Sequence, residues 1–113
     1  IMAAHIAVPS VTGDETPCTL SSYMISEVLR SRMGYDGIVV TDAMNMGAIS
    51  QQYDSAEAAV LALQAGVDLI LMPVDFHNAC EGVLAALETG ELTGERIDES
   101  VRRILRVKES VPR

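Results

Sequence analysis

Three short apolar runs divide the chain and predict β-strands over residues 1–8, 37–41 and 67–72. The runs read IMAAHIAV, GIVVT and VDLILM, are rich in Val and Ile, and are continuous rather than alternating with polar residues. Such runs are typical of parallel strands that are covered on both faces. Their starts are 36 and 30 residues apart, which is the length of a strand–helix unit.

Apolar residues at helical spacing fill the stretches between and after these runs. They predict helices over residues 21–33, 55–65, 75–89 and 98–109. Ser55 and Asp75 are the expected N-caps of the second and third helices. Glycines follow the first three helices, at a position where a left-handed backbone favours this residue: Gly34, Gly66 and Gly90.

The order of these elements predicts an α/β fold of parallel βα units with right-handed crossovers. The loops that follow strands, 9–20 and 42–54, are long, whereas the links from helix to strand are short. In parallel α/β proteins the sites lie beyond the carboxyl ends of the strands. Residues that follow the strands are therefore expected at the functional edge, and Asp68, at the start of a strand, at the opposite, structural end.

The length of 113 residues allows at most one domain. A (β/α)8 barrel needs about 250 residues, so this chain would supply about three of its eight units and would not close. The chain also opens at Ile1, already inside an apolar run. We therefore expect it to come from a larger polypeptide, or to associate with itself to cover open sheet edges.

Charge, hydropathy and cysteine content limit the partners and the cellular compartment to be expected for this protein. The net charge of −8 argues against nucleic acid as a partner, because phosphate binding needs a clustered basic surface. No run of 18 apolar residues occurs, so no membrane span is expected. Cys18 and Cys80 match no zinc or redox spacing and favour reduced thiols in a cytoplasmic protein, with an extracellular disulfide as the alternative.

Asp42 is the main candidate for chemistry, in the stretch GYDGIVVTDAMNM. It is either the acid of a capping turn after a strand or a reactive carboxylate at the mouth of a parallel sheet. The recognisable cap of the next helix is thirteen residues later, which weakens the first interpretation. Thr41 offers a hydroxyl that can orient the carboxylate. Met44 and Met46 offer apolar surface for a ligand or for ordinary packing.

No other residue completes a catalytic set with Asp42. His5 lies near the end of the first strand and is either a satisfied core residue or part of the rim. The other histidine, His77, is 72 positions away, so no metal site is predicted. The sequence has neither a glycine-rich phosphate loop nor a serine elbow, and no cofactor is expected. It offers one candidate nucleophile and no convincing general acid.

These segments together resemble the later part of the catalytic barrel of family 3 glycoside hydrolases, in the bacterial β-N-acetylhexosaminidase branch. The resemblance covers nearly the whole chain. It rests on IMAAHIAVP, TLSSYMISEVLRSRMGYDGIVVTDAMNMGAI, EAAVLALQAGVDLILMP and ERIDESVRRILRVKE. It implies that the fold is roughly the last three strands and helices of a (β/α)8 TIM barrel, an incomplete barrel on its own.

The resemblance also implies a reaction. Asp42 would be the nucleophile of a retaining hydrolysis of terminal β-linked N-acetylhexosamine, by way of a covalent glycosyl-enzyme. His5, Met44 and Met46 would line the pocket of the carbohydrate substrate. The family's sugar-binding Lys-His stretch and the His–Asp pair of its general acid/base lie upstream and are absent. The isolated chain is therefore expected to be inactive or nearly so.

Three alternatives remain open on the sequence. The parent could be a β-glucosidase or β-xylosidase of the same family, or the chain could be a non-catalytic scaffold fragment. A receiver module also places an acid after a parallel strand, but it needs an acidic pair after an earlier strand and a lysine after a later one. Here the first strand ends in Val8-Pro9, and the only lysine, Lys108, lies in the last helix.

Overall fold

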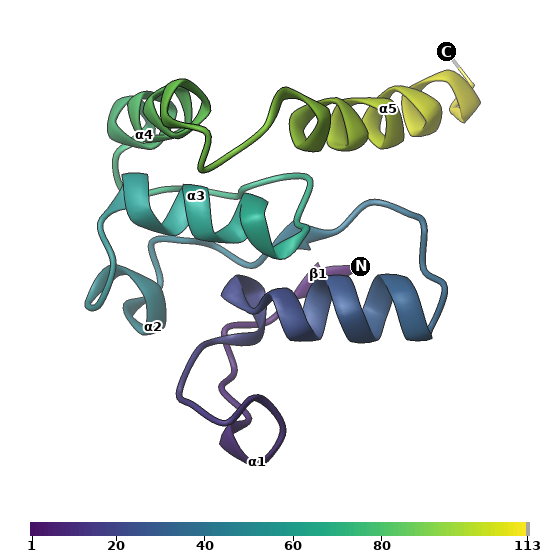
Figure 1. The fold of residues 1–113 in the computed structure, drawn as a ribbon. Coiled ribbons are helices and arrows are strands. Elements are labelled where there is room, and N and C mark those ends of the chain that lie inside the picture. Colours follow the sequence, from purple (N-terminus) through teal and green to yellow (C-terminus); the bar gives the residue numbers. More distant parts are fainter. Residues whose placement is uncertain (113) are drawn as a thin grey trace.

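The computed structural model describes residues 1–112, which form an α/β fold with long helices and a small parallel sheet (Figure 1). The elements are β1 (Met2–Ala3), α1 (Pro9–Thr12), η1 (Cys18–Leu20), η2 (Tyr23–Arg32), β2 (Val40–Thr41), α2 (Gly47–Ser50), α3 (Ser55–Ala65), α4 (Phe76–Thr89) and α5 (Gly94–Ser110). The short η1 is a 3-10 helix and η2 is a π-helix. Figure 1 shows α3 in the middle of the fold, with α4 and α5 above it and η2 below.

The sheet is parallel, as predicted, but its ladders are shorter than predicted. Parallel β1 and β2 pair Met2 with Val40 and Ala3 with Thr41, and residues 67–72 contribute only a parallel bridge between Val40 and Leu69. The third run does not extend into a strand because the hydroxyl of Thr41, rather than a backbone carbonyl, accepts the N–H of Leu71 at 2.9 Å. In the first run, the chain leaves the sheet after Ala3 and begins α1 at Pro9.

Only one face of this sheet is covered by residues 1–112. Val39 and Val67 are fully buried and pack in a core with residues of η2 and α3, such as Ile25 and Ala62. On the other face, Met2 and Leu69 are 56% and 41% exposed. Side chains of a strand alternate between faces, so the continuous apolar runs supply a second apolar face. The expectation that both faces are covered is wrong for these residues taken alone.

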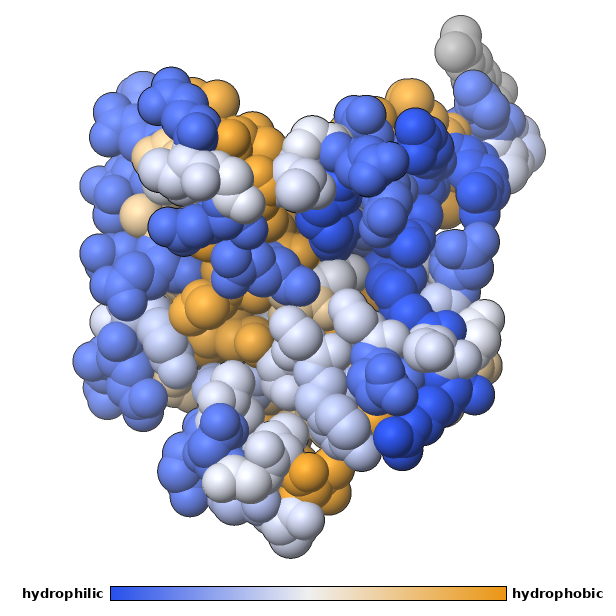
Figure 2. Space-filling model, in the orientation of Figure 1, coloured by the Kyte–Doolittle hydropathy of each residue, from blue (hydrophilic) through white to orange (hydrophobic). Residues whose placement is uncertain are grey.

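A second apolar cluster lies where α4 and α5 meet α3. Leu63, Ala86 and Leu92 are buried there, and half-buried side chains from all three helices surround them. Figure 2 shows hydrophobic surface in the gap between α4 and α5, flanked by polar side chains on both helices. α4 and α5 are therefore held to the sheet in two ways, by packing against α3 and by direct contacts with the sheet region.

The helix ends follow local chemistry, with three corrections. The helix predicted over residues 21–33 is the π-helix η2, which spans only Tyr23–Arg32. α3 spans the predicted 55–65, but its N-cap is Asp54, whose carboxylate accepts the N–H of Glu57; the Ser55 hydroxyl instead accepts the N–H of Asp75. α5 begins four residues earlier than predicted because the Thr93 hydroxyl accepts the N–H of Arg96 and caps it there. Asp75 caps α4 as predicted, and left-handed glycines end α3 and α4: Gly66 and Gly90.

Asp68 lies at the amino-terminal end of the sheet, on the side expected from the sequence, and its side chain is completely buried. Its Oδ1 accepts from the Ser100 hydroxyl (2.7 Å) and from Arg103 (3.0 Å). Its Oδ2 accepts from Arg30 (2.7 Å) and from the N–H of Val39 (2.9 Å). Burial by itself raises the pKa of this carboxyl. The hydrogen bonds from Ser100 and Val39, with the arginine charges, more than offset it, so that the pKa lies below its usual value.

Close packing of α3 against α4 depends on Gly82. A Cβ at this position would lie 2.5 Å from the Cβ and 2.8 Å from the Cα of Ala56, so the two helices would have to separate. We expect Gly82→Ala to lower the free energy of unfolding by about 1–3 kcal/mol, although alanine is the better helix former. Urea unfolding measures this. Gly94→Ala is the matched control, since its Cβ meets no atom within 4 Å; equal stability of the two variants would contradict the packing argument.

Candidate active site

Asp42 follows β2 directly and is half-buried at the carboxyl end of the sheet. Its N–H donates to the carbonyl of Ala3 at 3.0 Å, which continues the pairing of β1 with β2 for one residue. Its Oδ1 accepts the N–H of Ala43 at 2.8 Å. Within residues 1–112, no hydrogen bond or ion pair occupies Oδ2. The carboxylate therefore has one oxygen held by the backbone and one available to a reacting group.

The loop after Asp42 is tied to the third run. The N–H of Met44 donates to the carbonyl of Leu71 at 2.8 Å, and the N–H of Leu71 donates to the hydroxyl of Thr41. Thr41 is fully buried, so it does not orient the carboxylate of Asp42 as the sequence suggested. It instead links the strand that precedes Asp42 to the run beside it. The loop is thus tied to the third run by one backbone hydrogen bond and by one bond to a side-chain hydroxyl.

His5 lies on the other side of this loop and makes two hydrogen bonds. Its Nδ1 is 2.8 Å from the hydroxyl of Thr19, and its Nε2 is 2.9 Å from the carbonyl of Ala43. Thr19 is fully buried, with its hydroxyl 3.0 Å from the carbonyl of Ala4. The structure therefore brings His5 to the residue that follows Asp42, as expected from their shared edge of the sheet.

The two methionines of the loop have different surroundings. Met44 is 3% exposed and belongs to the core cluster with Val39 and Ile49. Met46 is 44% exposed. This placement favours packing for Met44 and leaves Met46 as the methionine that a ligand could contact.

Thr19 is the site residue that the sequence analysis missed. It is fourteen positions from His5, within a loop that carries no pattern of catalytic residues. It reaches His5 because the loop folds back: the N–H of Cys18 donates to the carbonyl of Ile6, and an antiparallel bridge joins Ala7 to Pro17. No sequence signal could have identified this contact, since it depends on how the loop closes.

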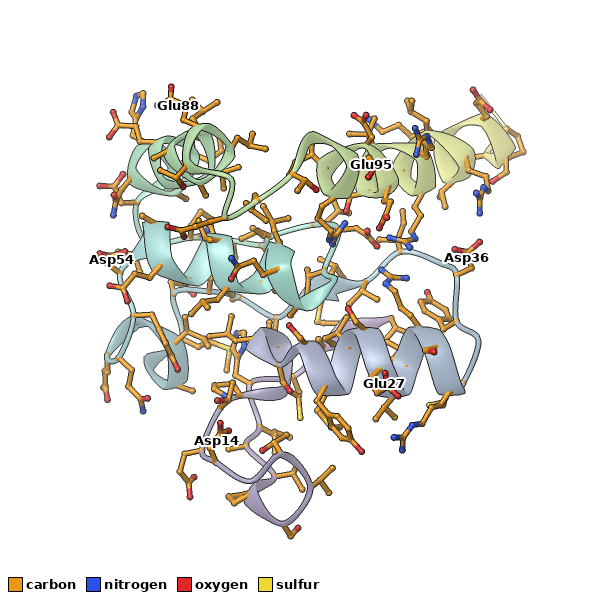
Figure 3. The ribbon with its side chains drawn as sticks, viewed as in Figure 1. Asp14, Glu27, Asp36, Asp54, Glu88 and Glu95 are labelled. Atoms are coloured by element: carbon orange, nitrogen blue, oxygen red, sulfur yellow. The ribbon has the colours of Figure 1, made fainter. Side chains whose placement is uncertain are left out.

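Other carboxylates project from the periphery. Figure 3 shows Asp54 at the start of α3, toward one end of the fold, and Asp36 at the other end. Asp36 is paired with Arg106 at 3.0 Å.

Among residues 1–112, no three His, Cys, Asp or Glu side chains are grouped closely enough to hold a metal ion. None of the helices in that range has the length and hydropathy of a bilayer span.

A hollow of about 360 Å³ adjoins the loop on the helix side. Its lining includes Met44, Tyr53, Asp54, Pro73 and Asp75 but not Asp42. It opens among α2, α3 and the start of α4. The position of Asp42, and not this hollow, marks the candidate active site.

Comparison with known proteins gives the family. Residues 1–107 match the model described as the glycosyl hydrolase family 3 N terminal domain. The chain belongs to glycosyl hydrolase family 3. Among solved family 3 structures, the β-N-acetylglucosaminidase of Paenibacillus sp. str. FPU-7 is 46% identical, with a TM-score of 0.91 over 96% of this chain and 21% of that one.

Two curated relatives match almost the whole chain. The β-hexosaminidase A of Pseudoalteromonas piscicida is 31% identical over 99% of this chain and 22% of its own length. A Cellulomonas fimi protein, named a β-N-acetylglucosaminidase/β-glucosidase, is 28% identical over 98% of this chain and 21% of its own. The chain thus spans about a fifth of these relatives.

Proposed function

We propose that this family 3 chain is the nucleophile-bearing segment of a longer retaining β-N-acetylhexosaminidase, called the parent below. The observation that carries the proposal is the carboxylate of Asp42, held by one oxygen at the carboxyl end of the sheet with the other oxygen available. The similarity to hexosaminidases and β-N-acetylglucosaminidases over nearly all of this chain supports the substrate class.

In the proposed reaction, Oδ2 of Asp42 attacks the anomeric carbon of a terminal β-N-acetylhexosaminide. The bond from that carbon to the leaving-group oxygen breaks, and a general acid from the rest of the parent protonates the oxygen. Water then attacks the anomeric carbon of the glycosyl-enzyme and gives its proton to the same group of the parent, now acting as a base. The bond to Asp42 breaks, and the β configuration is retained. A fixed carboxylate also stabilises the positive charge that develops on the sugar ring. Met46 is the proposed apolar contact to the sugar because it is exposed and lies in the loop that follows Asp42.

We further propose that the chain forms the last three units of a (β/α)8 barrel. In such a barrel the uncovered face of the sheet, with Met2 and Leu69, would face the interior and pack against the remaining strands. Self-association of the isolated chain is the alternative means of covering it.

We also propose a cytoplasmic location for the parent. Cys18 and Cys80 are free thiols, and disulfides are rare in the cytoplasm.

The isolated chain is expected to show no hydrolysis of 4-nitrophenyl β-N-acetylglucosaminide above the buffer rate. It provides a nucleophile, but the proposed general acid belongs to the rest of the parent. Within residues 1–112, the hydrogen bond to the carboxylate of Asp42 comes from the N–H of Ala43, which is not an acid. Release of nitrophenol, followed by absorbance, measures this, with the parent as positive control. Turnover by the isolated chain that disappears in Asp42→Asn would contradict the proposed division of the site.

The parent itself tests the substrate and the mechanism. We expect it to hydrolyse the nitrophenyl N-acetylglucosaminide faster than the matching glucoside and xyloside. Proton NMR of the first product should show the β anomer. The name of the Cellulomonas fimi relative includes β-glucosidase. If the parent prefers the glucoside, the proposed activity is wrong and β-glucosidase takes its place. Initial release of the α anomer would overturn the retaining mechanism.

A further inference from the structure

We propose that His5 is a positioning residue for the nucleophile, which acts through the backbone of Ala43 and not by contact with the sugar. This inference rests on the proposed function, because it assigns His5 a role in the attack by Asp42. It differs from the sugar-lining role that the resemblance implied for His5. The juxtaposition that carries it is the 2.9 Å contact between His5 Nε2 and the Ala43 carbonyl.

The peptide unit between Ala43 and Met44 is held from both sides. His5, which follows β1, lies against its carbonyl oxygen, and Leu71, beyond β2, accepts its N–H at 2.8 Å. The preceding peptide N–H, that of Ala43, donates to Oδ1 of Asp42.

The Ala43 carbonyl also accepts the N–H of Met46, at the longer distance of 3.3 Å. Rotation of Ala43 would disturb all four hydrogen bonds, of which the one from His5 is the only one made by a side chain of another segment. The contact from His5 therefore limits how Ala43 is oriented. The N–H of Ala43 bonds to Oδ1 of Asp42, so its orientation decides which carboxylate oxygen stays available.

The direction of the His5 hydrogen bond does not depend on the charge of the ring. A carbonyl oxygen only accepts, so Nε2 must carry a proton. If the Thr19 hydroxyl donates to Nδ1, the ring is the neutral Nε2–H tautomer. If that hydroxyl donates to Ala4, 3.0 Å away, Nδ1 also carries a proton. In both cases Nε2–H points at Ala43, and Thr19 holds the opposite side of the ring.

These contacts separate a positioning role from a sugar-binding role. Both ring nitrogens of His5 are bonded to protein groups, so a sugar hydroxyl could bond to the ring only by displacing Thr19 or Ala43. Loss of a sugar contact made equally in ground and transition states raises KM. Loss of alignment of the attacking oxygen lowers kcat with little change in KM, since a displacement of about 1 Å can reduce the rate about 100-fold.

Two substitutions of His5 in the parent distinguish the nitrogens. In His5→Gln the amide NH2 can take the place of Nε2 and still donate to Ala43. In His5→Asn the shorter amide reaches only the position of Nδ1, so the hydrogen bond to the Ala43 carbonyl is lost. The substrate is 2,4-dinitrophenyl β-N-acetylglucosaminide, whose leaving group needs no protonation, and kcat and KM are measured for the first turnover, so that kcat reports attack by Asp42. We expect His5→Asn to lower kcat about 100-fold with KM within about twofold, and His5→Gln to recover at least about tenfold of that loss.

Amide hydrogen exchange of peptides that cover residues 40–47 provides a second measurement, which needs no turnover. We expect faster exchange in His5→Asn than in His5→Gln or in His77→Asn, a matched change at an exposed histidine on α4. Thr19→Val should also accelerate this exchange, since it removes the partner of Nδ1 and leaves His5 in place. It therefore tests the inference if the His5 variants fail to fold.

The outcomes separate this inference from the proposed function. If the parent hydrolyses none of these glycosides, the proposed function is wrong, and the exchange experiment still decides whether His5 orders the loop. Raised KM with unchanged kcat in both His5 variants would make His5 a sugar contact and overturn the inference. Equal exchange over residues 40–47 in wild type, His5→Asn and Thr19→Val would overturn it as well.

Discussion

Asp42→Asn in the parent is expected to lower kcat by at least about 10⁴-fold with N-acetylglucosaminide substrates. Loss of a covalent nucleophile costs other enzymes at least this much, and a 10⁴-fold loss corresponds to about 5.5 kcal/mol of transition-state stabilisation. The amide keeps the shape of the side chain and can still accept the N–H of Ala43, so the loop need not rearrange. Steady-state kinetics on the dinitrophenyl substrate measure the loss.

Rescue by a small anion shows whether the lost group is the nucleophile. Asp42→Gly leaves a space from which azide can attack the anomeric carbon, and the product is then the α-glycosyl azide, of inverted configuration. Asp54→Asn is the control, since asparagine is also a good N-cap for α3, and its activity should equal that of the wild type. Wild-type kcat in Asp42→Asn would overturn the nucleophile assignment; loss without azide rescue would favour a structural role for Asp42.

Asp68→Asn is expected to lower the free energy of unfolding by about 3–5 kcal/mol, the range for removal of one partner from a buried ion pair. The substitution leaves Arg30 and Arg103, 12% and 14% exposed, without the buried carboxylate that they share. It also replaces one acceptor oxygen by an NH2 that faces donors. A typical domain has a stability of about 5–15 kcal/mol, so much of it would be lost. Urea unfolding of the parent measures the change.

The same carboxylate predicts the direction of a pH dependence. Its pKa in the folded protein is lowered, through hydrogen bonds and arginine charges that outweigh burial, below the value of about 3.9 in an unfolded chain. The unfolded state therefore binds the proton more readily. The contribution of Asp68 to stability is full above about pH 4–5 and is lost as the pH falls through the lower folded pKa. Thermal melts from pH 7 to pH 2 should show a steeper acid loss in wild type than in Asp68→Asn.

A surface ion pair provides the comparison for Asp68. Asp36 and Arg106 are paired, but their side chains are 72% and 66% exposed, and such pairs contribute little in water. Asp36→Asn should leave the melting temperature unchanged within error at neutral pH. A loss as large as that of Asp68→Asn would contradict the view that burial, and not the ion pair itself, makes Asp68 important.

Local sequence chemistry was sufficient for several features. The extent of α3 and the glycines that end α3 and α4 were predicted because helix formation and termination depend on residues within one or two turns. The apolar runs predicted parallel pairing of the strands, and the acid after the second run predicted the location of Asp42 at their carboxyl end. Parallel pairing places the ends of successive strands on one edge, so this required no knowledge of distant contacts.

Contacts between distant residues decided the rest. Ser55 is a good capping residue by type, but Asp54 caps α3 because the Ser55 hydroxyl is bonded to Asp75, twenty residues away. In the same way, the hydroxyl of Thr41 shortens the third strand by taking the N–H of Leu71, thirty residues away. A side chain's type limits what it can donate or accept, and only the folded chain decides which partner lies within reach.

In the candidate site, too, some features follow from short-range sequence pattern and others from contacts between distant residues. By itself the sequence determined the parallel order of its strands and the position of one carboxylate at their open edge, because both follow from short-range pattern. The tertiary structure decided that Thr19 holds His5 against the loop of Asp42, and that the sheet keeps one apolar face uncovered. The physical reason is that hydrogen bonding and burial act between groups that only chain folding brings together.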